Sequence, residues 1–355
     1  MKFARIFLRA LIGLIIAISG GWAVLALMYA GPPYGLLRNA VAALFAVLTL
    51  AAVIALFFRP LFLHSLSSRN WRRRAVAAYV VAFAALLVWW STIDPSNDRD
   101  WQSDVMVLPS ATIDGDVVTV HNIRNFDYRS EFDYTPNYYD KQFDLRELTG
   151  VDVIAVYWMG PAIAHVFLSF EFNRDDHLAI SIETRKEKAE AYSTLKGFFR
   201  QYELYYVVAD ERDVIRLRTN YRHDPVEDVY VYRAKGDVAN GRRLFMEYVH
   251  QINALTTEPE FYNTLTTNCT TSIWLNTRVN AQHLPLSWKV LVSGYLPQYL
   301  YDEGRLESYG LGFADLQQRV HVNARALAAG DATDFSQLIR AEQQNVNERA
   351  AESAP

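Results

Sequence analysis

Three long apolar segments open the chain, and they constrain its fold more than any other feature. They cover residues 10–29, 39–58 and 75–93. Each is close to the ~20 residues that cross the ~30 Å hydrocarbon core of a bilayer as a helix. A cleavable signal peptide has a shorter apolar run and is not followed at once by two further spans. We therefore predict a three-helix transmembrane anchor over residues 1–93.

Basic residues near these segments set the orientation. The N-terminus and the loop between the second and third segments are rich in Lys and Arg, whereas the loop between the first two holds only Arg38. Because basic loops stay in the cytoplasm, the N-terminus is predicted to lie inside and everything after Asp94 outside. The basic residues on the cytoplasmic side are Lys2, Arg5, Arg9, Arg59, Arg69, Arg72, Arg73 and Arg74.

The rest of the chain has the composition of a water-soluble α+β domain. Residues 94–103 form a polar linker that is too short to let the following domain leave the bilayer surface, and Trp101 is expected at the membrane interface. Residues 104–320 form the domain, and residues 321–355 are predicted to be a peripheral, helical and partly disordered tail. A net charge of −4 gives no sign of nucleic-acid binding.

Alternating and continuous apolar patterns predict the elements of this domain. The strands are expected over residues 117–129, 150–158, 164–172, 178–184, 204–209, 214–219 and 229–232, with a helix over 240–255.

Cys269 is the only cysteine of the 355 residues, which excludes an intramolecular disulfide and a thiolate zinc site. Asn268 or Thr267 is positioned to cap a helix that starts here. Cys269 would then lie in the first turn, where the partial positive charge of the helix terminus favours the thiolate. Cys269 is thus the candidate nucleophile, and the alternative is a small buried side chain.

His165 is the candidate base, because a half-buried imidazole at the start of an apolar strand needs a hydrogen-bonding partner. With a hairpin turn centred on Asp175, residues 167 and 183 pair, and His165 and Glu183 share one face. Glu183 is then placed to orient His165. A register slip would bring in the neighbourhood of Ser181 instead, and a surface ion pair is the other role open to Glu183.

Two arginines in an aromatic-rich stretch are candidates for binding substrate. Arg124 and Arg129 lie near Phe126 and Tyr128, and the planar guanidinium group binds phosphate through two hydrogen bonds. Either arginine is expected to hold a phospholipid head group, and the alternative is a structural or surface ion pair. No cluster of metal ligands is visible, so no metal or other cofactor is expected.

Four blocks of the chain resemble the Lnb N-terminal periplasmic domain family. They are residues 122–129 (NIRNFDYR), 164–170 (AHVFLSF), 181–185 (SIETR) and 266–271 (TTNCTT). The resemblance implies a periplasmic domain on a bacterial inner membrane, with Cys269 as nucleophile and His165 as base. Lnb members are implicated in N-acylation of bacterial lipoproteins.

The order of histidine before cysteine is also similar to that of circularly permuted NlpC-type papain-like domains. These domains include lecithin:retinol acyltransferases, which carry an acyl chain as a thioester. The implied fold is therefore a papain-like antiparallel sheet with a nucleophile helix.

The leading hypothesis is a membrane-anchored periplasmic thiol acyltransferase that moves an acyl chain from phospholipid, through Cys269, to an amine such as a lipoprotein N-terminus. Backbone N–H groups at the helix start, together with Asn268, are expected to stabilise the oxyanion. The expected partners are membrane phospholipid and lipoprotein substrates. A cysteine peptidase or amidase acting on envelope peptides or peptidoglycan is the first alternative. A non-catalytic envelope scaffold with a packed Cys269 is the second.

Overall fold

A computed structural model describes residues 2–31, 34–58 and 68–341 and separates them into two compact units. The first unit contains the chain up to Pro95 and the segment Ser193–Gln201, and the second contains Ser96–Tyr192 and the chain from Tyr202 onward. Arg59 and the last part of the predicted tail, residues 342–355, lie outside the described residues.

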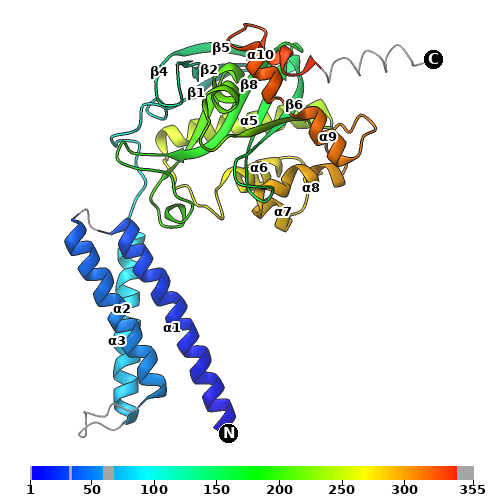
Figure 1. The fold of residues 1–355 in the computed structure, drawn as a ribbon. Helices are drawn as coiled ribbons and strands as arrows, with labels where there is room; N and C mark the ends of the chain where they lie inside the picture. The colour runs from blue at the N-terminus through cyan, green and yellow to red at the C-terminus, as the bar shows by residue number, and fades with distance from the viewer. Residues whose placement is uncertain (1, 32–33, 59–67, 342–355) are drawn as a thin grey trace. The chain divides into compact units, whose positions relative to one another are not determined.

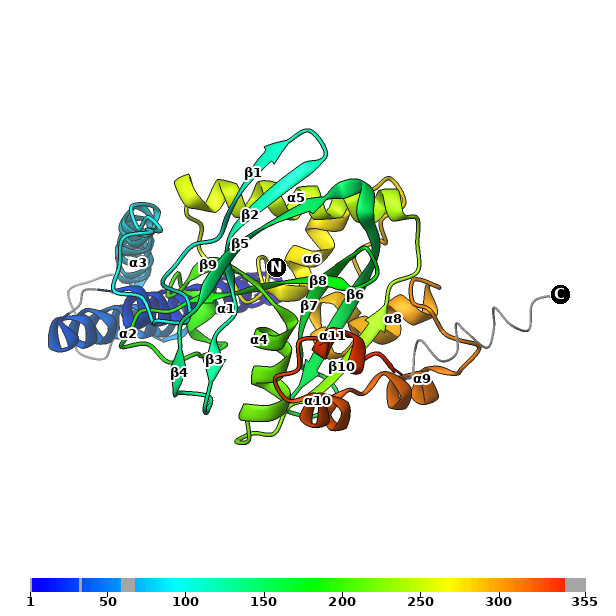
Figure 2. The ribbon, with the colours of Figure 1, turned by 90° about the horizontal axis from the view of Figure 1, so that it is seen from above.

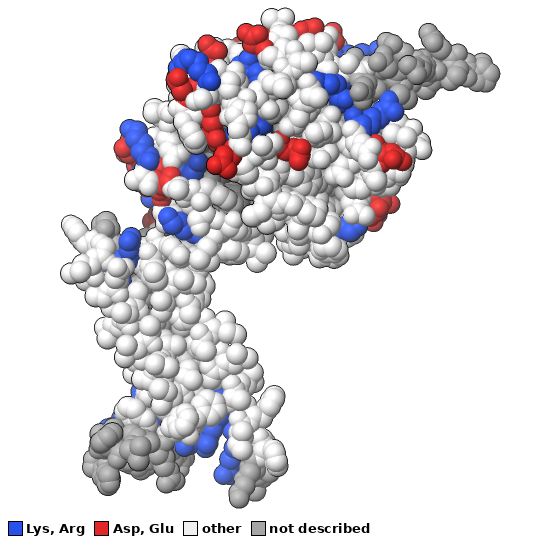
Figure 3. All heavy atoms as spheres, in the orientation of Figure 1, with Lys and Arg blue, Asp and Glu red and all other residues white. Residues whose placement is uncertain are grey.

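Three long helices build the first unit (Figure 1). Each contains a stretch long and apolar enough to cross a membrane, so the prediction of three apolar N-terminal helices is confirmed and all three are candidate spans. The helices extend beyond the apolar segments into their basic flanks, and Lys and Arg gather at the end of the bundle that carries the N-terminus (Figure 3). The helices are α1 (Lys2–Ala30), α2 (Gly35–Phe57) and α3 (Ser68–Ser91).

Small residues and polar contacts hold these helices together. A Cβ on Gly20 of α1 would overlap the side chain of Thr49 on α2, and Ser19 Oγ lies 2.7 Å from the Tyr79 hydroxyl on α3. Close backbone approach and interhelical hydrogen bonds matter here because lipid is as apolar as the helix surfaces. Arg200, in the segment Ser193–Gln201, donates to the Trp90 carbonyl at 2.7 Å.

An eight-stranded sheet organises the second unit. The strand order is β1-β2-β9-β8-β7-β6-β10, and β5 pairs with β2. All neighbours are antiparallel except β2 and β9. The strands are β1 (Ser110–Asp114), β2 (Val117–Arg124), β5 (Tyr138–Asp144), β6 (Leu148–Tyr157), β7 (Ala164–Phe172), β8 (Asp176–Arg185), β9 (Glu203–Ala209) and β10 (Asp228–Arg233), with β3 (Asp127–Tyr128) and β4 (Tyr134–Thr135) paired separately.

Helices cover both faces of the sheet (Figures 1 and 2). Side chains alternate along β6, so Val153 enters the larger core and Ile154 the smaller one on the opposite face. The larger core lies under α5 (Val238–Thr257), α6 (Cys269–Thr277), α7 (Trp288–Leu291), α8 (Leu296–Asp302) and α9 (Phe313–Val320). The smaller core lies under α4 (Glu211–Arg216), α10 (Asn323–Ala329) and α11 (Phe335–Leu338).

One predicted strand and one predicted position were wrong. Residues 214–219 are not a strand but the end of α4 and part of a π-helical turn, Leu217–Tyr221, because Asp210 caps α4 by accepting the Arg212 N–H at 2.9 Å. Trp101 is only 4% exposed and stacks on the Arg185 guanidinium, so burial in the domain replaces the expected interface position.

The chain from residue 321 to 341 is part of the core rather than a peripheral tail. Phe335 and Ile339 are fully buried in the smaller core, and the Arg340 guanidinium lies 2.8 Å from Asp152 and 2.6 Å from Glu211. Burial by itself would raise the pKa of Glu211, but the Arg340 charge lowers it well below its usual range. A buried ionic cluster therefore ties the C-terminal segment to the sheet.

Candidate functional site

Cys269 is the first residue of α6, and a capping box fixes where that helix begins. Asn268 Oδ1 accepts the Thr271 N–H at 2.9 Å, and Thr271 Oγ1 accepts the Asn268 N–H at 3.0 Å. Thr267 has a different task, since its hydroxyl oxygen accepts the Asn263 N–H at 2.7 Å in the preceding loop. Of the two predicted caps, Asn268 is the one that forms, and it places Cys269 in the first turn.

Replacing Asn268 by alanine is expected to lower the free energy of unfolding of the domain by about 1 kcal/mol, because the Thr271 N–H loses its acceptor. Denaturant unfolding of the full chain in detergent, followed by tryptophan fluorescence, measures the loss. Asn268→Ser keeps a capping oxygen and should retain most of the stability. Equal losses in the two variants would contradict a capping role.

A split in the sheet lets α6 reach His165. β7 and β8 pair from Phe172↔Asp176 only as far as Leu168↔Ile180. Beyond that point β7 continues along β6 and β8 continues along β9. The backbone N–H of Val166 lies in the unpaired part of β7 and donates to the Cys269 sulfur. Helix α6 packs on one face of the sheet, and at this gap its Cys269 meets His165, which lies on the side of the opposite face.

The hairpin turn is centred one residue earlier than predicted. The pairing of residues 167 and 183 was wrong by two positions, because Leu168 pairs with Ile180. Asn173 and Arg174 both have positive φ, 50° and 67°, which makes a tight turn of the kind that joins antiparallel strands. A shift of two positions preserves the alternation of faces, so His165 and Glu183 still lie on the same side.

Ser181 connects His165 to Glu183. The His165 Nε2 atom lies 2.7 Å from Ser181 Oγ and 3.5 Å from Glu183 Oε1. The Ser181 hydroxyl donates to the same Glu183 oxygen at 2.9 Å. The two predicted candidates for a third member of the site, Ser181 and Glu183, therefore occur together in one hydrogen-bonded chain.

Arg218 completes this chain, and the sequence reasoning missed it. Its Nη2 atom donates to Glu183 Oε1 at 3.1 Å, and its Nη1 atom donates to Glu227 at 3.2 Å. Arg218 is 5% exposed and lies in the π-helical turn that follows α4. Residues 214–219 had been predicted as a strand, and that error hid a buried cation facing Glu183.

Opposite pKa shifts mark the Cys269–His165 pair. Burial raises the pKa of Cys269, but the hydrogen bond and charge of His165 lower it by more, so the net shift is downward. Burial and the Arg218 charge lower the pKa of His165, but Cys269 and Glu183 raise it by more. For Glu183, burial is outweighed by His165 and Arg218, which lower its pKa well below the usual range. The pair therefore favours thiolate and imidazolium together.

Neither predicted phosphate-binding arginine has a free guanidinium group. Arg124 is 6% exposed, its Nη2 atom donates to Asp213 at 2.7 Å and its Nη1 atom donates to the Asp104 carbonyl. Its expected role in binding a head group is corrected to a buried structural ion pair. Arg129 is exposed in the β3–β4 hairpin and pairs with Asp133 at 2.5 Å. It therefore forms the surface ion pair that was the alternative to substrate binding.

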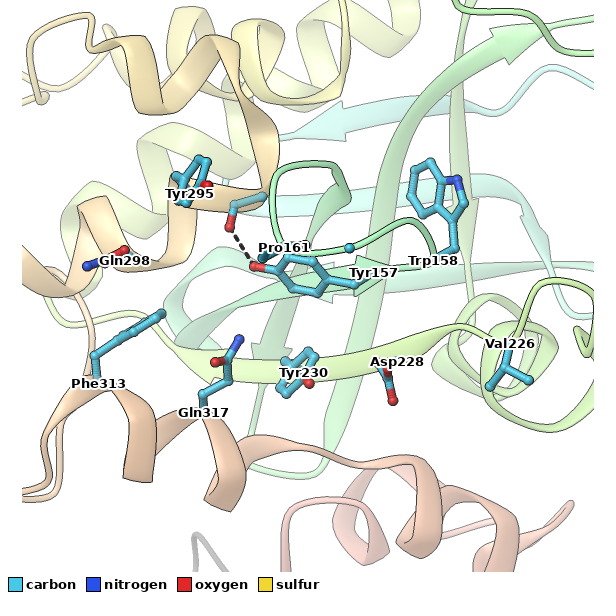
Figure 4. Close-up of a pocket in the computed structure, with 12 residues that line it drawn as sticks. Tyr157, Trp158, Pro161, Val226, Asp228, Tyr230, Tyr295, Gln298, Phe313 and Gln317 are labelled. Atoms are coloured by element: carbon cyan, nitrogen blue, oxygen red, sulfur yellow. Dashed lines mark hydrogen bonds between the residues drawn. The ribbon is translucent and has the colours of Figure 1, made fainter.

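Two hollows lie near the site. A groove of about 500 Å³ runs beside the loop that leads into His165, and the Tyr157 hydroxyl donates to the Gly294 carbonyl across it at 2.7 Å (Figure 4). A second, mainly apolar cavity of about 390 Å³ lies under α6 and begins at Thr270, next to Cys269. Across the described parts of the chain, no group of three or more His, Cys, Asp and Glu side chains is arranged to hold a metal ion.

Comparison with known proteins gives the family of this region. Residues 134–294 match the family described as the Lnb N-terminal periplasmic domain, and the block at 122–129 lies before the matched stretch. No curated protein and no solved structure matches the chain. With three candidate spans, the chain is a membrane protein with a periplasmic domain. The stretch that carries both Cys269 and His165 belongs to the Lnb N-terminal periplasmic domain family.

Proposed function

We propose that this protein is a thiol acyltransferase anchored in the bacterial inner membrane, with its catalytic domain in the periplasm. The observation that carries the proposal is the pairing of Cys269, at a helix N-terminus, with a histidine whose far nitrogen is held by Ser181 and Glu183. A nucleophile, a base and a group that orients the base are the parts that covalent acyl transfer requires. The split sheet and nucleophile helix fit the papain-like arrangement, which we include in the proposal.

In this proposal each nitrogen of the imidazole has its own task. Nε2 is directed to Ser181, which leaves Nδ1 for the thiol. The Ser181 hydroxyl donates its hydrogen bond to Glu183, so the Ser181 oxygen can accept a hydrogen bond from the Nε2–H of His165. Arg218 keeps Glu183 charged, because its cation faces the same carboxylate oxygen at 3.1 Å. This chain stabilises the imidazolium that forms when the thiol is deprotonated.

The reaction proceeds in two acyl-transfer steps. The Cys269 thiolate attacks the carbonyl carbon of a phospholipid ester, a C–S bond forms, and the C–O bond breaks. The lysophospholipid oxygen leaves with the proton held by His165. An amine, such as a lipoprotein N-terminus, then attacks the thioester, His165 accepts its proton, and the amide product leaves as Cys269 is regenerated.

Backbone N–H groups in the first turn of α6 are the proposed oxyanion donors. The Asn268 side chain is not needed for this task, because its oxygen caps α6 and its Nδ2 donates to the Thr264 carbonyl at 2.6 Å.

The apolar cavity under α6 supports a substrate with a hydrocarbon chain. Thr270, Ile273 and Trp274 present one side of α6 to it, and Val153 and Leu168 of the sheet lie opposite. Its volume of about 390 Å³ is within the usual ~300–1,000 Å³ of small-molecule sites. The wall of the cavity starts one residue from the proposed nucleophile.

Incubation of the purified full chain with phospholipid carrying a labelled acyl chain tests the proposal. We expect label on Cys269, released by hydroxylamine as a thioester, and transfer of the label to an added diacylglyceryl peptide with a free α-amine. Absence of label from Cys269, in protein that releases fragments from peptidoglycan or envelope peptides, would refute acyl transfer in favour of hydrolysis.

Thiol reactivity gives a pH prediction. Because the net shift of the Cys269 pKa is downward, its alkylation by iodoacetamide should persist at pH values below the ordinary cysteine pKa of about 8.5 and fade only as the pH drops through the lowered value. His165→Ala removes the imidazolium but leaves the burial, so the alkylation profile should move to higher pH. Identical profiles in wild type and variant would instead indicate a merely packed thiol.

A further inference from the structure

Five large apolar side chains are exposed on two segments of the second unit. Met159 and Ile163, in the loop between β6 and β7, are 62% and 41% exposed. Leu286, Trp288 and Leu291, in and just before α7, are 52%, 58% and 44% exposed. Exposed apolar side chains are unremarkable when scattered, but a contiguous group marks an interaction site.

Hydrogen bonds join the two segments into one surface, here named the apolar rim (residues 158–163 and 285–295). The Gly294 N–H donates to the Ala162 carbonyl at 3.0 Å. A Cβ on Gly294 would overlap the Pro161 carbonyl oxygen, so only glycine permits this approach. The Trp288 and Tyr295 rings lie 5.3 Å apart. The exposed side chains thus stand on a single rigid support.

The apolar rim is bonded to both halves of the Cys269–His165 pair. Ala164, which precedes His165, donates its N–H to Ser293 Oγ at 3.0 Å. Thr270, which follows Cys269, donates its hydroxyl to the Val290 carbonyl at 2.7 Å. A surface that binds to the apolar rim would therefore be held next to the thiol.

Charge is nearly absent from the apolar rim. Lys289 is the one charged residue in its two segments, and its amine is paired with Asp302 at 2.7 Å. The surface over α7 is largely uncharged in Figure 3, whereas charged side chains are spread over the upper part of the same unit. Such a surface suits an apolar partner rather than a charged one.

The short linker between α3 and the second unit keeps the apolar rim near the membrane, which is an apolar partner. Span α3 ends at Ser91, and Asn97 is already bound to the second unit through the Leu255 carbonyl at 2.7 Å. Six residues reach at most about 20 Å, so the domain stays beside the bilayer at all times. The lipid surface is therefore the apolar partner present at the highest local concentration. Tryptophan is also one of the two side chains enriched at the boundary between lipid and water.

We propose that the apolar rim docks into the headgroup–acyl boundary of the membrane and holds the Cys269–His165 pair next to the lipid. Burial of apolar area at this boundary supplies the binding energy, as for other interfacial segments. The inference does not rest on the proposed acyl transfer, because docking is independent of any reaction at Cys269.

Site-specific photocrosslinking of the full chain tests this docking. The chain is reconstituted in vesicles of phosphatidylethanolamine and phosphatidylglycerol, with p-benzoylphenylalanine in place of Trp288. The control carries the same group in place of Phe132, which lies in the loop between β3 and β4 of the same unit and is 88% exposed. We expect roughly tenfold more phospholipid adduct from position 288 than from position 132. The same ratio in a Cys269→Ala background would separate docking from catalysis.

Two outcomes would overturn the proposal. One is an equal lipid yield from positions 132 and 288. The other is an adduct from position 288 to protein, which would make the apolar rim a contact with a second copy or another membrane protein. Leu291→Ser, tested with the probe at position 288, should lower the lipid yield several-fold. Leu291 is exposed, so its replacement should not disturb the fold. An unchanged thermal midpoint of the variant would verify this.

Discussion

Under the proposed thioester mechanism, Cys269→Ala is expected to abolish acyl transfer, lowering its rate by at least about 10³-fold, because the sequence has no second cysteine to form the thioester. His165→Ala should cause a loss of similar size, since the thiol then has no base and the leaving group no acid. The double variant should be no worse than either single variant, because the two residues act as a unit. Transfer of labelled acyl chain from phospholipid to a peptide amine measures all three rates.

A histidine away from the site provides the matched control. His250 is exposed in the second half of α5, and His250→Ala should retain the wild-type rate. Cys269→Ser tests whether the nucleophile must be a thiolate. A neighbouring imidazole ionises a hydroxyl group much less than it ionises a thiol. Substantial transfer by Cys269→Ala, in protein with an unchanged thermal midpoint, would rule out the thioester mechanism.

Arg340→Met is expected to destabilise the second unit by about 3–5 kcal/mol, because it leaves the buried Glu211 carboxylate without its cation, whereas Asp152 keeps its ion pair with Arg233 at 2.9 Å. Asp152 and Glu211 are both fully buried, and Arg340 is the group that lowers the pKa of Glu211 despite its burial. Denaturant unfolding of the full chain in detergent measures the loss. Arg129→Met, which removes an exposed ion pair with Asp133, is the control and should change the stability little.

The pH dependence of this loss has a definite sign. A carboxylate whose pKa is lowered by folding contributes stability above its unfolded pKa, and this contribution disappears as the pH falls through the folded value. The ordinary pKa of a glutamate is 4.5 and the pKa of Glu211 is lowered, so the stability difference between wild type and Arg340→Met should be largest at neutral pH and shrink in acid. Adding Glu211→Gln to Arg340→Met should restore part of the stability. A constant difference from neutral to acid pH would contradict the ionic account.

Much of the architecture could be predicted because it depends on patterns that extend over a few residues. The three spans follow from segment length and hydropathy. The position of Cys269 in the first turn follows from Asn268, whose cap is a contact between neighbours in the chain. The prediction that His165 and Glu183 share one face follows from the period of two along strands. It is correct although the predicted register was wrong by two positions, because such a shift keeps each side chain on its face.

Other features depended on how distant segments pack. Nothing local to Val166 indicates that β7 and β8 separate there, because the separation reflects which neighbour each strand pairs with. Arg124 was predicted to face a ligand, but its partner Asp213 lies far along the chain. The ion pairs of Arg340 with Asp152 and Glu211 were hidden for the same reason.

The sequence was enough to predict that this protein is anchored by three helices, that its domain lies outside the cytoplasm, and that its single thiol starts a capped helix. These properties depend on hydrophobic length, the distribution of charge and local hydrogen bonds, all of which act within one segment. One chain of polar contacts next to Cys269 becomes visible in the folded protein, and it contains His165, Ser181, Glu183 and Arg218. The thiol lies on a helix that packs on one face of the sheet, whereas the imidazole lies on a strand of the sheet, on the side of the opposite face. They meet because the pairing of β7 and β8 ends at Leu168 and Ile180.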